Sequence, residues 1–149
     1  MRLKIIIASL FIVIQAHAVQ VTDENKKLGF CEFVYFYSAQ SAQMQNNEGL
    51  AKSYLRRASM LTVANFMLME QDGVISNEKI KATRAESLLI KPKFDINAKL
   101  VLSELAKCDS NSLPIASKIR DSNKKLWNKN YDELQQELFN QNLLTLGIK

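Results

Sequence analysis

Histidine, cysteine, proline and glycine are all scarce in this chain of 149 residues, which contains one, two, two and four of them respectively. The one histidine, His17, lies in an N-terminal segment that we expect to be removed on export. Without an imidazole, Ser-His-Asp and Cys-His systems lack their general base, and His-rich zinc sites and the Glu-x-x-His pairs of di-iron bundles lack ligands. The sequence also contains no C-x-x-C-H haem site, G-x-G-x-x-G fingerprint or G-x-x-x-x-G-K phosphate loop. We therefore expect a non-enzymatic protein with no cofactor and no metal.

The N-terminal residues have the three parts of a secretory signal peptide. Arg2 and Lys4 precede an apolar run over residues 5–14, which Gln15 and the small-residue pattern Ala16-His17-Ala18 follow. This run is much shorter than the roughly 20 apolar residues of a spanning helix. The alternatives are an uncleaved anchor or a buried N-terminal helix. We predict that residues 1–18 are a cleavable signal peptide and that residues 19–149 form one helical domain in the periplasm or outside the cell.

Export also affects the choice of partner. Loss of Arg2 and Lys4 lowers the formal net charge from +5 to +3, which is only mildly basic. A small positive charge on an exported protein favours solubility over polyanion binding. We therefore expect no nucleic acid partner, and we expect another exported or envelope protein instead.

Two cysteines, Cys31 and Cys108, remain after the predicted cleavage. In an oxidising compartment such a pair is most simply one disulfide, and only one connectivity exists. The alternative is two separate buried thiols. Neither residue belongs to a C-x-x-C pair, and neither has a histidine as base, so a redox or nucleophilic role is not expected.

The mature region is rich in helix-forming residues and shows no sustained apolar–polar alternation, which predicts helices rather than strands. We expect helices over residues 23 or 28 to 45, 48–70, 77–90, 96–108, 114–124 and from 131 onward. Asn47, Ser76 and Asp95 are the expected N-caps of the second, third and fourth helices, and Asn130 with Glu133 resembles a capping box for the last. Lys91-Pro92 is expected to stop the third helix, and residues 109–112 to form a polar loop.

Short loops between four helices favour an antiparallel, up-down-up-down bundle. In that topology the start of the first helix and the end of the fourth lie at the same end of the bundle. Cys31 and Cys108 fall at these two places, so the topology and the disulfide support each other. The predicted fold class is an all-α antiparallel bundle of about four core helices with a C-terminal helical extension and one disulfide.

An aromatic block in the first helix is the main functional candidate, because apolar residues there occur on every side of the helix. A helix of this kind is either surrounded by others or has an extra contact face. We interpret the block as a protein interaction surface of an inhibitor, immunity factor, chaperone or assembly accessory. Its residues are Phe33, Tyr35, Phe36 and Tyr37.

Two alternative functions use different sets of residues. A bundle that binds a small apolar ligand would line its cavity with Phe33, Tyr37, Tyr54 and the methionines. A glycan-active enzyme would need a pair of carboxylates, for which Glu32 and Glu104 are the candidates, although solvated faces are the simpler interpretation of both. Met60, Met67 and Met69 could in principle bind Cu(I), but core packing is the more common role of methionine.

A basic segment late in the chain is the last candidate. It could rest on anionic lipid or on an acidic partner, and we favour the simpler interpretation of a solvated helix face with one anchored indole. Its residues are Lys118, Arg120, Lys124, Lys125, Trp127 and Lys129.

Overall fold

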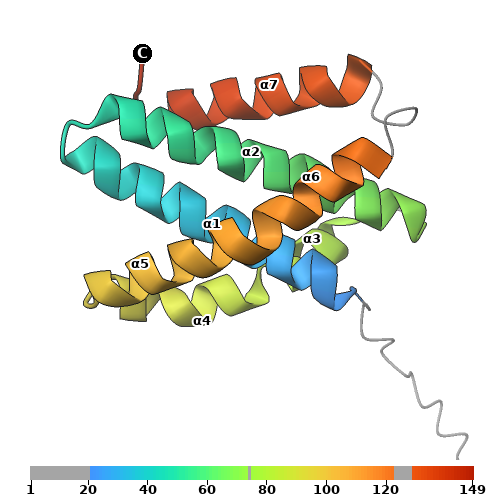
Figure 1. The fold of residues 1–149 in the computed structure, drawn as a ribbon, viewed down its shortest axis with the longest axis horizontal. Helices are drawn as coiled ribbons and strands as arrows, with labels where there is room; N and C mark the ends of the chain where they lie inside the picture. The colour runs from blue at the N-terminus through green and yellow to red at the C-terminus, as the bar shows by residue number, and fades with distance from the viewer. Residues whose placement is uncertain (1–20, 74, 123–128) are drawn as a thin grey trace, which may run out of the picture.

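The structure is a computed structural model that describes residues 21–73, 75–122 and 129–149, and the regular structure in these ranges is helical throughout (Figure 1). Successive long segments reverse direction, so the predicted all-α antiparallel bundle with one disulfide is confirmed. The elements are α1 (Asp23–Met44), α2 (Glu48–Gln71), α3 (Asn77–Thr83), α4 (Ala85–Phe94), α5 (Ala98–Lys107), the π-helical turn η1 (Cys108–Ser112), α6 (Leu113–Ser122) and α7 (Lys129–Thr145).

The α1–α2 hairpin is the centre of the bundle, and short polar side chains set its ends. Thr22 accepts a hydrogen bond from the Asn25 backbone N–H at 3.1 Å, and the Asn25 side chain accepts one from the Thr22 N–H at 3.2 Å. This reciprocal cap satisfies backbone donors that a helix start leaves free. Asn46 takes a positive φ of 56°, and Asn47 caps α2 by accepting from Leu50 N–H at 3.1 Å, as predicted.

The main core lies where α1 and α2 face each other and where the later helices cover them. Leu28, Val34, Leu61 and Val63 are fully buried in it. A second cluster at the other end of the hairpin packs Leu55 and Ala39 against Phe139 of α7. The predicted C-terminal extension is therefore packed on α2, and the Arg56 guanidinium lies 4.8 Å from the centre of the Phe139 ring.

The third predicted helix is in fact two helices, and the prediction that Pro92 stops it is wrong. Ser76 caps α3 as expected, but the helix breaks at Arg84 and restarts as α4. Pro92 lies inside α4. The hydrogen bond from the Asp95 N–H to the Lys91 carbonyl, 3.1 Å long, spans the proline. Phe94 is 3% exposed and packs on Phe33, which holds this last turn in place against the local preference of the residue before proline.

The fourth helix also begins and ends differently from the prediction. Asn97, not Asp95, caps α5 by accepting from Leu100 N–H at 3.1 Å, and Asp95 ends α4. The polar residues after Cys108 are not a loop. They form η1, in which the Leu113 N–H bonds the Cys108 carbonyl five residues back, so that α5, η1 and α6 make one continuous helical segment.

The capping box predicted for the last helix involves Asn130 and Glu133. Helix α7 begins at Lys129, so Asn130 lies inside its first turn rather than ahead of it, and the Asn130 side chain is outside the described part. Within the described ranges, no helix combines the length and the apolar character needed to cross a bilayer.

The disulfide joins the two ends that the topology brings together. Cys31 of α1 and Cys108 of η1 are bonded, with their Cα atoms 5.5 Å apart and a sequence separation of 77. The Ser112 hydroxyl donates to Cys31 Sγ at 3.1 Å. The predicted pairing is confirmed, and it fixes the α5–α6 segment across α1.

Candidate functional site

A groove of about 380 Å³ opens between the C-terminal half of α1, the start of α2 and α5. Among the residues that the structure describes, no Asp, Glu, Lys or Arg lines it, so this wall is uncharged. Aromatic and aliphatic side chains make up most of its wall, and hydroxyl and amide groups from α1 supply the rest. The lining residues are Tyr37, Ser38, Ser41, Ala42, Gln45, Leu50, Tyr54, Phe94, Ala98, Val101, Leu102 and Leu105.

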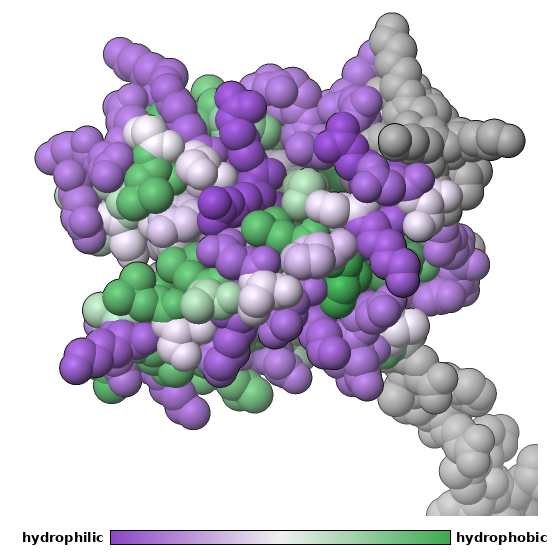
Figure 2. All heavy atoms as spheres, in the orientation of Figure 1, coloured by the Kyte–Doolittle hydropathy of each residue, from purple (hydrophilic) through white to green (hydrophobic). Residues whose placement is uncertain are grey.

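Large apolar side chains remain exposed at the mouth of this groove. Leu102 of α5 is 64% exposed and Leu50 of α2 is 41% exposed, whereas Leu105, one turn beyond Leu102, is only 7% exposed. In Figure 2 apolar residues form a green band over α5 on the left of the view, beside a hollow between α5 and the α1–α2 hairpin. Exposed apolar surface that borders a depression is typical of a docking site.

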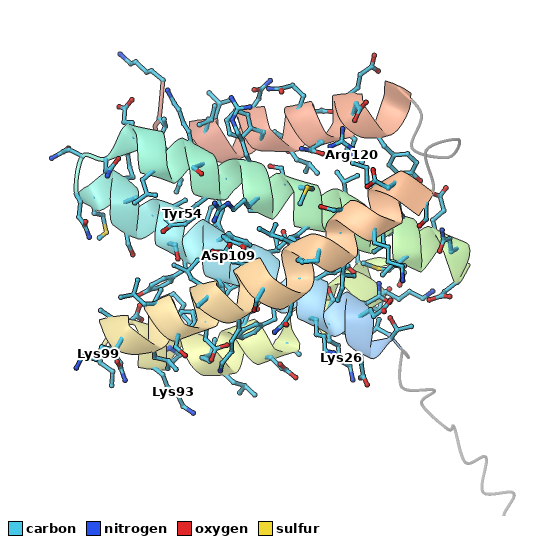
Figure 3. All side chains as sticks on the ribbon, viewed as in Figure 1. Lys26, Tyr54, Lys93, Lys99, Asp109 and Arg120 are labelled. Atoms are coloured by element: carbon cyan, nitrogen blue, oxygen red, sulfur yellow. A yellow bond between two sulfur atoms is a disulfide. The ribbon has the colours of Figure 1, made fainter. Side chains whose placement is uncertain are left out.

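Behind the Tyr54 side of the groove, polar contacts join α1, α2 and η1. Tyr35 donates its hydroxyl to Asp109 Oδ1 at 2.5 Å, and Arg57 Nη1 donates to the same oxygen at 2.9 Å. The Arg57 guanidinium also lies 6.0 Å from the centre of the Tyr54 ring. Tyr54 and Asp109 are labelled in Figure 3 on the same side of the molecule. Burial and the neighbouring Asp109 carboxylate both raise the pKa of the Tyr35 hydroxyl, so it stays protonated as a donor.

The predicted aromatic surface is mostly used inside the fold. Tyr35 is 0% exposed, so the prediction that it forms part of an interaction surface is wrong. Phe33 stacks on Phe94 with ring centres 5.9 Å apart, and Phe36 packs on the second core cluster. Only Tyr37 lines the groove, where its hydroxyl donates to Asp95 Oδ1 at 2.9 Å. The cause is that α2, α3, α4, α5 and η1 all contact α1, leaving little of its surface free.

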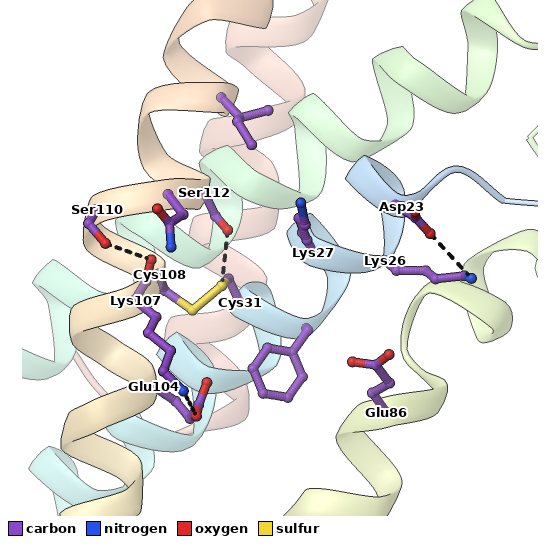
Figure 4. Close-up of a pocket in the computed structure, with 13 residues that line it drawn as sticks. Asp23, Lys26, Lys27, Cys31, Glu86, Glu104, Lys107, Cys108, Ser110 and Ser112 are labelled. Atoms are coloured by element: carbon purple, nitrogen blue, oxygen red, sulfur yellow. Dashed lines mark hydrogen bonds and ion pairs between the residues drawn. A yellow bond between two sulfur atoms is a disulfide. The ribbon is translucent and has the colours of Figure 1, made fainter.

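A second depression, of about 590 Å³, lies beside the disulfide (Figure 4). Its wall carries both signs of charge, mostly paired within one helix. Lys107 Nζ lies 2.7 Å from Glu104, and Lys26 Nζ lies 3.7 Å from Asp23. These pairs neutralise one another locally, so the depression presents no concentrated charge toward a ligand.

The two candidate carboxylates do not share a site. Glu104 lines the depression beside the disulfide, whereas Glu32 lines a different one, which Phe36 and Arg84 also line. Glu32 is 17% exposed and accepts from Arg84 Nε at 3.3 Å and Nη2 at 2.7 Å. Burial raises the pKa of the Glu32 carboxyl, and the Arg84 guanidinium opposes that shift. A two-carboxylate glycosidase needs its acids on either side of one bond, so this arrangement does not assemble that chemistry.

The residues of the ligand-cavity hypothesis are also dispersed. Tyr37 and Tyr54 line the groove, but Phe33 lines the depression that contains Glu32. Met67 and Met69 are 2% and 1% exposed, in keeping with core packing. In the described part of the chain, no cluster of three or more His, Cys, Asp or Glu side chains is placed to hold a metal ion.

Part of the predicted basic surface lies outside the described residues. Lys118 and Arg120 are exposed on α6, and Arg120 Nη2 lies 3.9 Å from Asp132 of α7. Nothing is described for Lys124, Lys125, Trp127 or the side chain of Lys129.

Sequence reasoning missed the α5 wall of the groove. The core stripe of α5 is Val101, Leu105 and Cys108, all of them buried, and Leu102 is a leucine that lies off this stripe. A large aliphatic residue on the polar side of an amphipathic helix was the available signal. The comparison of the chain with family models, curated proteins and solved structures found no match.

Proposed function

We propose that this is an exported, non-enzymatic protein that binds another exported or envelope protein through the groove between α1–α2 and α5. The observation that carries the proposal is the pair of leucines at its mouth, Leu102 and Leu50, which are exposed beside an uncharged lining. Full burial of an exposed leucine contributes about 1.5–3 kcal/mol, and a partner would supply the part of this that the exposed fractions of Leu102 and Leu50 leave.

The lining favours an apolar segment of a protein as the occupant. Tyr37 and Tyr54 provide large, stiff surfaces with a hydroxyl at the tip, as in many protein interfaces. The hydroxyls of Ser38 and Ser41 donate back to α1, at 2.8 Å and 3.2 Å, which leaves their oxygens free to accept from a partner. An amphipathic helix with a row of aliphatic residues fits a surface of this kind.

Export is the other part of the proposal. The leader at residues 1–18 supports it, and so does the Cys31–Cys108 disulfide, because such bonds persist mainly in oxidising compartments. Intact mass of the protein purified from its native compartment tests both points. Cleavage after Ala18 with loss of two thiol hydrogens is expected, and a retained leader with free thiols would contradict this part.

Affinity capture with matched variants tests the groove. The bait is the exported protein, and the test variant is Leu50→Ser with Leu102→Ser. The control is Leu144→Ser, which makes the same change at a leucine of α7 that is 78% exposed. A true partner is captured by the wild type and by the control but not by the test variant.

Titration of the purified partner then measures how much the double substitution weakens binding. We expect the double substitution to weaken binding at least tenfold, because two buried aliphatic groups are lost. Equal affinity for wild type and double variant would move the partner site elsewhere.

A further inference from the structure

Helix α4 has a second apolar face that the bundle does not cover. Its inner face packs on α1 through Phe94, with Ser87 also buried at 4% exposure. At about 100° per residue, Leu88, Leu89 and Pro92 lie on the opposite side of this helix. Ile96 follows in the turn after α4. We call Leu88, Leu89, Pro92 and Ile96 the α4 ridge.

The ridge is among the most exposed apolar surfaces in the described part of the chain. Leu88, Leu89 and Ile96 are 78%, 76% and 87% exposed. Such values mean that most of each side chain is in water, although Leu88 also lines the depression that contains Glu32. The ridge is therefore largely exposed, whereas Leu102 and Leu50 border the groove.

Lysines flank the ridge. Lys91 and Lys93 lie on either side of it by helical spacing, and Lys99 follows at the start of α5. Figure 3 shows Lys93 and Lys99 pointing away from the body of the molecule where α4 passes into α5. No ion pair joins either of these two lysines to an acid in the described part of the chain.

The Asp95 carboxylate, close to the end of the ridge, already accepts two hydrogen bonds. Asp95 accepts from the Tyr37 hydroxyl at 2.9 Å and from Lys91 Nζ at 3.0 Å, which ties its carboxylate to α1. Glu86, the other acid of α4, lies at the start of the helix. The end of the ridge near Ile96 is thus positively charged toward solvent.

We propose that the α4 ridge rests on an anionic lipid surface, with Leu88, Leu89 and Ile96 entering the interface and Lys93 and Lys99 meeting the headgroups. An apolar helical face with lysines at its edges is the pattern of interfacial helices. Lysine also suits this position because its alkyl chain follows the apolar surface while the ammonium group reaches the headgroups.

The shape of the ridge favours lipid over a second protein. A specific protein interface of standard size buries about 800 Å² on each partner and requires a complementary surface. Leu88, Leu89 and Ile96, on one short helix and the turn after it, supply much less than that. A fluid lipid surface adapts to a narrow ridge, and its negative charge complements the lysines. This proposal does not rest on the groove or on its partner.

Flotation with lipid vesicles tests the proposal. The probes are vesicles of equal parts phosphatidylcholine and phosphatidylglycerol, and vesicles of phosphatidylcholine alone. Intact mass first confirms that every sample has the same N-terminus, because a retained apolar leader would itself enter lipid. We expect the wild type to float with the anionic vesicles, to bind the neutral ones weakly, and to dissociate as salt is raised.

Two sets of variants assign the binding to the ridge. Leu88→Ser, Leu89→Ser and Ile96→Ser together should lower the partition coefficient at least tenfold, because three apolar contacts are lost. Lys93→Gln with Lys99→Gln should remove the preference for anionic lipid. The matched controls are Leu144→Ser on α7 and Lys26→Gln with Lys27→Gln on α1, and both should bind like the wild type. All these positions are exposed, and circular dichroism checks that the helices persist.

Three outcomes would overturn the proposal. The first is no flotation of the wild type, and the second is equal flotation of the ridge variant. The third combines two results: the wild type does not bind vesicles, and the ridge variant no longer binds a purified protein partner. That combination would make the ridge a protein docking face.

Discussion

The two halves of α1 differ in the contacts that hold them: polar contacts and the disulfide in the N-terminal half, and apolar packing beside a groove in the C-terminal half. The N-terminal half lies in what we call the closed end, formed by Asn25, Gly29, Asn65, Thr83 and the Cys31–Cys108 disulfide. The C-terminal half lies in the open end, formed by the groove and its rim leucines, Leu50 and Leu102. One helix therefore makes its polar and covalent contacts in its first half, which also lines the depression beside the disulfide, and lines the groove with its second half.

Directed polar contacts hold the closed end. Asn25 Nδ2 donates to Asn65 Oδ1 at 2.8 Å, and both side chains are almost fully buried, at 1% and 2% exposure. Thr83 donates its hydroxyl to the Ile80 carbonyl at 2.8 Å and packs directly on Gly29. Buried polar groups that satisfy one another fix a single geometry, because any other arrangement leaves them unpaired.

At the open end, apolar surface that could stabilise the fold stays in water instead. Leu102 is 64% exposed, and its neighbour Leu105 is 7% exposed. The difference between the two ends indicates that the polar contacts that fix the fold and the apolar surface available for binding lie along different halves of α1. Four sets of substitutions test this contrast, in decreasing order of their expected effect on stability.

Removing the disulfide should have the largest effect. The bond closes a loop between cysteines with a sequence separation of 77, and the chain-entropy model gives a loss of about 4 kcal/mol when such a loop is opened. Cys31→Ala with Cys108→Ala, unfolded in urea, measures this loss. A change below about 1 kcal/mol would show that packing alone holds the α5–α6 segment on α1.

Gly29→Ala should destabilise the closed end by about 2 kcal/mol. A Cβ at this position would lie 2.5 Å from the Thr83 carbonyl oxygen and 2.9 Å from the Thr83 Cβ, so backbone must move to admit it. Gly49→Ala is the control, because its nearest neighbour is the Asn47 side chain at 4.0 Å. That substitution should stabilise α2 by about 0.5–1 kcal/mol. Chemical denaturation of both variants tests the contrast, and equal effects would contradict it.

Glu32→Gln should change how stability depends on pH. Burial raises the pKa of the Glu32 carboxyl above its ordinary value of 4.5, so the folded state holds this proton more tightly than the unfolded state does. Its contribution to stability is therefore fully present below pH 4.5 and is lost as pH rises through the raised pKa. The wild type should lose stability relative to Glu32→Gln over that interval.

Urea denaturation from below pH 4.5 to neutral pH measures the effect of Glu32. Glu137→Gln makes the same change of charge at an exposed position and corrects for the effect of net charge. Parallel stability profiles for wild type and Glu32→Gln would contradict the assignment.

Changes at the open end should have the smallest effect on stability. Leu102→Ser should alter the free energy of unfolding by no more than about 0.5 kcal/mol, because most of this side chain is already in contact with water, and Leu50→Ser should cost more because Leu50 is less exposed. Leu105→Ala, one turn along α5, should cost at least about 2 kcal/mol. Thermal and urea denaturation compare them, and a large loss at Leu102 would mean that the rim is part of the core.

Local sequence signals predicted the helices well where caps and periodicity were strong. Asn47 and Ser76 cap the helices expected of them, and α1 and α2 lie within a residue or so of their predicted bounds. The errors came where tertiary contacts outweigh local preference. Pro92 stays inside a helix because Phe94 is packed in the core, and residues 109–112 form a π turn that places Asp109 against Tyr35 and Arg57.

The candidate site was less predictable than the fold. An aromatic helix indicated that α1 would have many neighbours, but periodicity does not show which of its sides a later helix will cover. The aromatic pattern therefore predicts Tyr35 at the surface and does not point to Leu102. Both depend on where the α5–η1–α6 segment crosses the hairpin, which is decided by contacts between residues far apart in the chain.

The sequence by itself determined the helical class, the hairpin at its centre and the pairing of Cys31 with Cys108, because helix propensity, capping and the count of cysteines are local or combinatorial properties. Only the tertiary structure decided which apolar side chains remain in water. That outcome depends on how long helices cross, and it leaves the groove at the open end and the α4 ridge as the two apolar surfaces for which we propose partners.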